Sequence, residues 1–144
     1  MDISVIIPAY NAEKYLNKAL ESAVNQDFKG SYEILIADDV STDNTKQLIE
    51  NWHYKYPNLI KPIFRSVNLG CSENSYQLCI NSTAKYLAFL DSDDFWTIPN
   101  KLQIQFDYLE NHRDMGMLCS NAYIYKENKT DTRYSNNQSG PVLF

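Results

Sequence analysis

Short apolar runs alternate with longer segments of helical periodicity along this chain. Residues 3–7, 32–37 and 86–90 are apolar runs with the length and composition of buried strands. After the first run, apolar side chains recur over residues 12–24 at the i, i+3, i+4, i+7 spacing of an amphipathic helix. Strand, polar loop and helix follow one another at least three times. This order predicts an α/β fold, with a mainly parallel sheet flanked by helices.

Two further runs extend the predicted sheet. Residues 59–65 predict a short strand, and Pro62 within it indicates a place near the sheet edge, because proline cannot donate a hydrogen bond to a neighbouring strand. Residues 117–125 predict a last strand. Beyond it, residues 126–140 are polar and show no periodicity, which predicts a loop or tail.

The polar residues between the runs predict where the helices begin. Asn11 is expected to cap the first helix, and the segment 41–45 is rich in capping residues for the second. Ser72 is expected to cap the third helix. Pro99 is well placed as the first residue of a helix that ends near residue 111.

Composition narrows the class of protein. A chain of 144 residues, 44% of them hydrophobic, is long enough to bury one core, and we assign residues 1–125 to one domain and 126–144 to a polar loop or tail. The net charge of −5 argues against a nucleic-acid-binding surface. No apolar run approaches the roughly 20 residues of a membrane span, and the apolar run at residues 3–7 predicts a strand, so we expect no signal peptide. Three cysteines without C-x-x-C spacing indicate reduced thiols, so a cytoplasmic protein is expected, with association at the inner face of the membrane left open.

An acidic cluster, Asp91-Ser92-Asp93-Asp94, directly follows the apolar run 86–90. Two carboxylates about 4 Å apart repel by roughly 4 kcal/mol at the effective dielectric of a partly buried site. A divalent cation with a preference for oxygen ligands, Mg²⁺ or Mn²⁺, would remove that repulsion. The alternative is a turn in which the aspartates only cap the next helix.

Polar residues also follow the other two runs. Asp38 and Asp39 come directly after residues 32–37, and Pro8-Ala9-Tyr10-Asn11 follows residues 3–7. In open parallel α/β sheets, ligands bind outside the carboxyl ends of the strands. The three loops are therefore expected to form one site.

Other phosphate-binding and nucleophile motifs are absent. The chain contains no G-x-G-x-x-G, no G-x-x-x-x-G-K-[ST] and no G-x-S-x-G. With four glycines in total, a cradle of backbone amides is a poor explanation for phosphate binding. A metal ion held by carboxylates is the remaining way to bind a polyphosphate.

Four segments now stand in a characteristic order: SVIIPAYN at 4–11, EILIADDVSTDNT at 33–45, NLG at 68–70 and YLAFLDSDD at 86–94. Together they resemble the inverting nucleotide-sugar glycosyltransferases of family 2, which have the GT-A fold. The resemblance covers roughly residues 2–125, the N-terminal, donor-binding portion of such enzymes.

The resemblance implies a nucleotide-diphosphate-sugar donor and a Mn²⁺ or Mg²⁺ cofactor at the D-x-D motif. A UDP-sugar is the expected donor, because a carboxylate at the position of Asp38 can accept a hydrogen bond from the ring N–H of uracil. The resemblance also implies transfer with inversion to a saccharide or lipid-linked acceptor, in the synthesis of a polysaccharide or glycoconjugate, and it leaves a homodimer open. The implied donor-binding residues are Pro8, Ala9 and Tyr10 around the nucleoside, Asp38 at the base, Asp91 by the ribose and sugar, and Ser92 as a further donor contact. Asp93 and Asp91 are implied at the metal.

Two positions depart from the family pattern, and one function has no candidate. Val40 stands where glycine is common, so its backbone is expected in the β region. Ser75 stands where an arginine is common. No general base is identified, and the family leads us to expect it beyond Phe144.

Two other functions stay open. A sugar-nucleotide nucleotidyltransferase shares the fold neighbourhood, but it would normally open with a glycine-rich basic loop, which is absent after Ile7. A non-catalytic nucleotide-binding module would keep the donor half alone.

Overall fold

The computed structural model describes residues 1–126 and 129–134. The chain divides into two compact units, Met1–Gln103 and Ile104–Phe144. The domain boundary expected after residue 125 stays a prediction. Among the described residues, no helix is long and apolar enough to cross a membrane.

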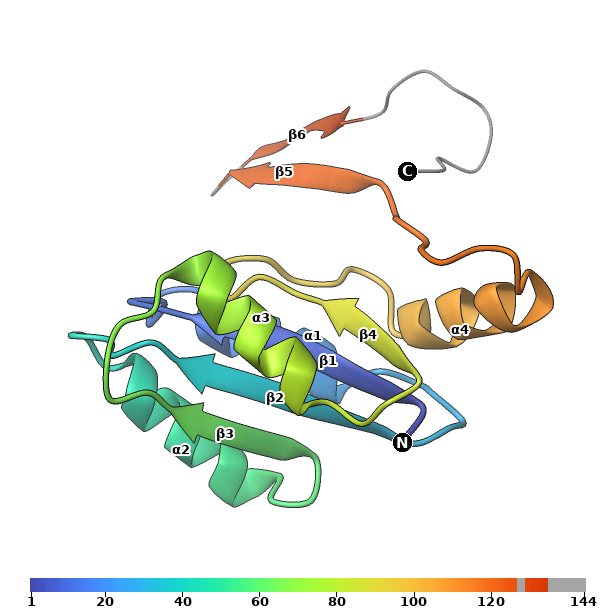
Figure 1. Ribbon diagram of the computed structural model, residues 1–144. Helices are drawn as coiled ribbons and strands as arrows, with labels where there is room; N and C mark the ends of the chain where they lie inside the picture. The colour runs from blue at the N-terminus through green and yellow to red at the C-terminus, as the bar shows by residue number, and fades with distance from the viewer. Residues whose placement is uncertain (127–128, 135–144) are drawn as a thin grey trace. The chain divides into compact units, whose positions relative to one another are not determined.

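The first unit contains a four-stranded, fully parallel sheet in the order β3-β2-β1-β4 (Figure 1). The predicted α/β fold with a parallel sheet is confirmed. The central strands are almost continuously apolar because both of their faces are covered by helices. The predicted edge position of Pro62 is also confirmed, since β3 is an outer strand. The strands are β1 (Ile3–Ala9), β2 (Tyr32–Asp38), β3 (Ile60–Phe64) and β4 (Tyr86–Phe89).

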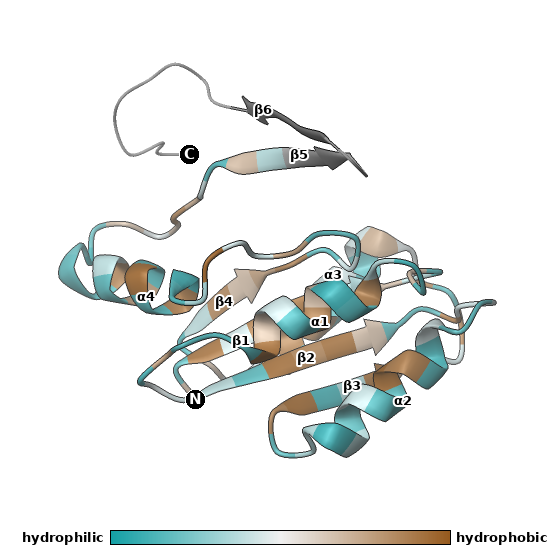
Figure 2. Ribbon diagram, turned by 180° about the vertical axis from the view of Figure 1, so that it is seen from behind, coloured by the Kyte–Doolittle hydropathy of each residue, from teal (hydrophilic) through white to brown (hydrophobic). Residues whose placement is uncertain are grey.

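Helices cover both faces of this sheet. α3 (Cys71–Asn81) lies on one face, and α1 (Leu16–Val24) and α2 (Thr45–Lys55) lie on the other (Figures 1 and 2). Figure 2 shows β2 brown, hence hydrophobic, along most of its length. On the α3 face, Leu78 packs with Leu35 and Ala37 in a buried apolar cluster. The core therefore lies on both faces of β1 and β2, and the loops that follow these strands lie outside it.

Asn11 does not cap α1, so that prediction is wrong. α1 begins only at Leu16, after a turn, and no side chain caps its first amides. The side chain of Asn11 lies five residues before the helix and instead accepts hydrogen bonds from the backbone N–H and hydroxyl of Thr42. Its backbone is left-handed, with φ 48°, a conformation that asparagine tolerates.

Two other predicted helix starts are shifted. α3 begins at Cys71 with Gly70 as its N-terminal flanking residue, so Ser72 lies inside the first turn and does not cap. Gly70 has φ 80°, which glycine adopts without steric cost. α4 (Lys101–Asn111) begins two residues after Pro99, which lies in the preceding turn.

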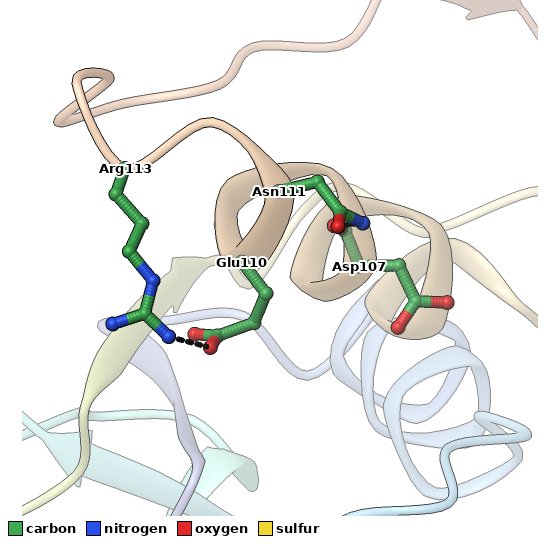
Figure 3. A network of polar contacts seen from close by, with 4 residues as sticks. All are labelled: Asp107, Glu110, Asn111 and Arg113. Atoms are coloured by element: carbon green, nitrogen blue, oxygen red, sulfur yellow. Dashed lines mark hydrogen bonds and ion pairs between the residues drawn. The ribbon is translucent and has the colours of Figure 1, made fainter.

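The C-terminal end of α4 carries local polar contacts, shown in Figure 3. The amide of Asn111 donates to the backbone carbonyl of Asp107 at 2.7 Å, which satisfies one carbonyl of the last turn. Arg113 and Glu110 form an ion pair at 3.2 Å (Figure 3). Because the Arg113 side chain is largely exposed, such a pair contributes only about 0–1 kcal/mol.

The second unit contains an antiparallel strand pair, β5 (Ala122–Lys126) and β6 (Lys129–Tyr134). The predicted last strand 117–125 was too long, because residues 117–121 have no regular structure. The prediction of a loop or tail was wrong for residues 129–134, which form β6. Antiparallel pairing needs no apolar run, and the threonines and tyrosine of β6 favour extended backbone. Residues 127–128 and 135–144 lie outside the described residues.

Candidate functional site

The strand order brings two of the predicted loops together. β1, β2 and β3 follow one another in one direction across the sheet, whereas β4 pairs with the other side of β1. The order therefore reverses between β1 and β4, and ligands of open α/β sheets bind at such a switch point. Tyr10 follows β1 and Asp91 follows β4, so they flank this point. The Leu90 N–H donates to the Ile6 carbonyl at 3.1 Å, which extends the pairing up to the acidic cluster.

The residues that end β1 differ in what they offer a ligand. Pro8 is half-buried, whereas Ala9 is 2% exposed and its carbonyl accepts from the Asp39 N–H at 2.9 Å. Tyr10 is 52% exposed, so its ring is available to stack against a flat group. Tyr10 is thus the residue of this segment that presents most surface.

Asp38, the last residue of β2, is a buried carboxylate with unused bonding capacity. It is 3% exposed, and one oxygen, Oδ2, accepts the Ser41 N–H at 3.3 Å. The other oxygen, Oδ1, is buried and has no hydrogen-bond partner among the described residues. Buried polar atoms in folded proteins are nearly always satisfied, so an orphan oxygen at a strand end indicates a ligand-binding group.

Asp39 has a different role from its neighbour. It is 2% exposed, and its two carboxylate oxygens accept the backbone N–H groups of Leu69 and Gly70, each at 2.8 Å. The Asn68 amide donates to the Asp39 carbonyl, also at 2.8 Å. Asp39 therefore holds the N-L-G turn against the end of β2. The N-L-G motif at residues 68–70 is the sequence signal for this contact.

Val40 has φ 65°, so the expectation of a β-region backbone was wrong. The cause lies on either side of it. The Asp39 N–H is bonded to the Ala9 carbonyl, and the Ser41 N–H turns back to the Asp38 carboxylate. The chain reverses between these anchors, and a β-branched residue is forced into the left-handed region, where strain of about 1–3 kcal/mol is usual.

The loops after β1 and β2 are joined by hydrogen bonds. The Asn11 N–H donates to the Ser41 hydroxyl at 2.9 Å, and the Glu13 N–H donates to the Asp43 carboxylate at 3.1 Å. Asp43 also accepts from Thr45. Burial alone would raise the pKa of Asp43, but the hydrogen bonds from Thr45 and Glu13 lower it below its usual value. Asp43 thus joins the loops after β1 and β2, in addition to the contact with Thr45 at the start of α2 that the capping pattern of the sequence indicated.

The acidic cluster forms a turn at the end of the β4 segment. Asp91 and Asp93 are exposed, Ser92 is half-buried, and the Asp94 N–H donates to the Asp91 carbonyl at 3.0 Å. Burial, and then the negative charges of Asp93 and Asp91, raise the pKa of Asp94. The three carboxylates are therefore close enough to repel one another, as the spacing predicted.

A metal ion at this turn would need oxygen ligands from a bound substrate in addition to those of the protein. Among the described residues, no three histidine, cysteine, aspartate or glutamate side chains lie close enough to hold an ion by themselves. Mg²⁺ is commonly bound by one or two carboxylates together with substrate phosphates and water. Asp91 and Asp93 fit that pattern, because both are exposed at one turn.

Comparison with known proteins agrees with this geometry. The model of the family "Glycosyl transferase family 2" matches residues 4–143. The minor teichoic acid biosynthesis protein GgaA of Bacillus subtilis is 34% identical over 137 residues, which is 92% of this chain and 30% of GgaA. An uncharacterized protein of Mycobacterium tuberculosis is 34% identical over 134 residues, again 92% of this chain. This chain spans 38% of the length of that mycobacterial protein.

Solved structures give the same assignment. S. aureus TarS in complex with UDP superposes with a TM-score of 0.70 at 31% identity, over 78% of this chain and 33% of that one. A mannosyltransferase from Pyrobaculum calidifontis, solved with GDP-Man and Mn²⁺, has a TM-score of 0.69 at 21% identity and supports the fold alone. The fold is of the GT-A type. With a family model over nearly all of its length and relatives above 30% identity, this chain belongs to glycosyl transferase family 2.

Proposed function

We propose that this chain is the donor-binding portion of a glycosyltransferase that transfers a sugar from a UDP-sugar to an acceptor hydroxyl with inversion. The observation that carries the proposal is the orphan Oδ1 of Asp38 at the edge where Tyr10 and the Asp91 turn flank the switch point of the sheet. The UDP complex of TarS, a relative at 31% identity, supports uridine as the nucleoside.

Asp38 and Tyr10 are proposed to bind the base, with Pro8 and Ala9 behind it. A carboxylate oxygen that lacks a protein donor suits the ring N–H of uracil, because a hydrogen bond to a charged acceptor is about twice as strong as a neutral one. The exposed Tyr10 ring offers an apolar face to the flat base. Recognition by hydrogen bonding would discriminate against bases that lack this N–H.

Asp93 and Asp91 are proposed to hold Mn²⁺ or Mg²⁺ together with the donor diphosphate, and Ser92 is proposed to lie beside the ribose and sugar. A divalent ion bound there would neutralise the charge that develops on the leaving diphosphate. The chain's own contribution is to hold the carboxylates at one tight turn, through the bond between the Asp94 N–H and the Asp91 carbonyl.

The attacking hydroxyl needs a general base and an oriented acceptor. Apart from Asp94, the carboxylates at this edge of the sheet are already assigned to the nucleobase, to the metal ion or to contacts between loops. We therefore propose that the general base lies beyond Phe144. The names of GgaA and of the poly(ribitol-phosphate) beta-glucosyltransferase of Bacillus spizizenii favour an acceptor in a surface polysaccharide, either saccharide or lipid-linked. Such a reaction would proceed at the cytoplasmic face of a membrane, and a homodimer is compatible with it.

Calorimetric titration of the chain with UDP, GDP and TDP tests the proposal. We expect UDP to bind most tightly and to need Mn²⁺ or Mg²⁺, so that EDTA abolishes most of the affinity. Asp93→Asn should weaken metal-dependent binding by about tenfold or more, because one metal ligand loses its charge. Asp27→Asn is the matched control, since Asp27 is exposed in the loop before β2, at the opposite end of the strand. Equal UDP binding in EDTA and in Mn²⁺ would remove the metal from the proposal.

A further inference from the structure

The loops at the carboxyl edge of the sheet are rich in carboxylates and poor in cations. These loops are residues 10–15, 39–44, 65–70 and 90–100. Their carboxylates are Glu13, Asp39, Asp43, Asp91, Asp93 and Asp94, and their only lysine or arginine residues are Lys14 and Arg65. A diphosphate donor brings further negative charge to this edge. Each cation there therefore contributes more to binding of the donor than it would on a surface of mixed charge.

α3 supplies no cation to this edge. Its sequence contains no lysine, arginine or histidine. The Ser75 hydroxyl, at the position where the family resemblance leads one to expect arginine, donates back to the Cys71 carbonyl at 2.7 Å. The positive charge for the nucleotide must therefore come from another element or from a metal ion.

Arg65 is held at this edge by two anchors. It follows β3 directly, and its N–H donates to the Asp38 carbonyl at 3.0 Å, which ties it to the strand end that carries the orphan carboxylate. Its side-chain Nε donates to Oδ1 of Asn74 at 3.0 Å. Asn74 is 1% exposed, and its own amide donates to the Ala37 carbonyl at 3.0 Å. A buried amide fixed to β2 thus orients the guanidinium.

The guanidinium has bonding capacity that the protein does not use. Its Nη2 is buried and has no acceptor among the described residues, while Arg65 as a whole is half-buried. Asp38, bonded to the same stretch of backbone, has the orphan acceptor Oδ1. Within residues 1–126 no ion pair joins the two side chains. A buried donor and a buried acceptor that both lack a partner, at adjacent strand ends, point to groups outside the described residues that supply an acceptor for Arg65 and a donor for Asp38.

We propose that Arg65 is a further donor-recognition residue, whose guanidinium binds acceptor oxygens of the nucleotide that Asp38 holds. This inference rests on the proposed function. A uridine nucleotide offers the required pair of groups, since its ring N–H is a donor flanked by two carbonyl acceptors and its diphosphate adds further oxygens. Arginine suits either kind of oxygen, because its planar fork donates several N–H groups in fixed geometry. Because Nη2 is buried, a nucleotide that bonds this atom must displace the group that covers it.

Titration of uridine, UMP and UDP, each with Mn²⁺, into the wild-type chain and into Arg65→Met tests the assignment. Arg65→Met keeps an apolar stem of similar length and removes the charge. Lys61→Met is the matched control, because it removes the same charge four residues earlier, where the Lys61 ammonium donates to the Pro57 carbonyl near the opposite end of β3. We expect Arg65→Met to bind UDP at least about tenfold more weakly than Lys61→Met does.

The three ligands distinguish the two sources of oxygen. An equal loss for uridine, UMP and UDP assigns Arg65 to the base, and a loss that grows from uridine to UDP assigns it to the phosphates. UDP binding by Arg65→Met as tight as by Lys61→Met would overturn the inference and leave the proposed function standing. Failure of the wild-type chain to bind UDP would overturn both. If circular dichroism shows that Arg65→Met does not fold, Arg65→Gln, which keeps a donor near Asn74 without the charge, is judged by the same criterion.

Discussion

The left-handed backbone of Val40 leads us to predict that glycine at this position gives a more stable protein than alanine does. For a residue with a Cβ, this conformation costs about 1–2 kcal/mol relative to the right-handed regions. Glycine escapes that cost but loses about 0.5–1 kcal/mol more backbone entropy on folding. Val40 has φ 65° and is 39% exposed, and both Val40→Gly and Val40→Ala remove its two γ-methyl groups, so the two variants differ only in the β carbon. Their difference isolates the backbone, and we expect Val40→Gly to be more stable than Val40→Ala by about 0.5–1 kcal/mol.

Urea unfolding of the two variants, followed by circular dichroism, measures this difference. A matched pair in the middle of α2 gives the opposite sign: Glu50 is exposed in that helix, and Glu50→Gly should be less stable than Glu50→Ala by about 1 kcal/mol. The reversal between the two sites is the signature of a left-handed residue 40. If Val40→Ala proved more stable than Val40→Gly, the backbone of residue 40 would be relaxed and the strain argument would be refuted.

Two further predictions concern the aspartates of the site. Asp39→Asn should lower the free energy of unfolding by about 2–4 kcal/mol in urea titration, because the new amide accepts only one of the two N–H groups of Leu69 and Gly70; a loss below about 0.5 kcal/mol, the size expected for the exposed control Asp27→Asn, would contradict this role. Burial, and then the charges of Asp93 and Asp91, raise the pKa of Asp94, so the fold favours the neutral carboxyl group. The stability that the neutral form contributes is complete below the ordinary pKa and is lost as the pH rises through the raised pKa. Asp94→Asn should therefore raise the melting temperature at about pH 7 and change it little near pH 3, below the ordinary pKa of aspartate, about 3.9; an equal change at both pH values would exclude titration of Asp94 as the cause.

Much of the first unit follows from local patterns in the chain. The apolar runs of β1 and β2 predict strands buried on both faces, because only such strands can be hydrophobic at nearly every position. Pro62 indicates the edge strand, since proline lacks the N–H of an inner strand. The acidic turn after the third apolar run was also visible in the sequence. Hydrophobic periodicity and backbone chemistry are properties of neighbouring residues, so the sequence alone determines these elements.

Contacts between distant segments were decided only by the tertiary structure. The reversal of strand order places Tyr10 beside the turn of Asp91, and no local pattern encodes which strands become neighbours. The side chain of Asn11 does not cap α1 as predicted but accepts a hydrogen bond from Thr42, 31 residues away. The left-handed Val40 follows from one anchor on the neighbouring strand β1 and one at the end of β2, which together outweigh the preference of a β-branched side chain. These loops are short and polar, so their conformations depend on partners that only the assembled sheet brings within reach.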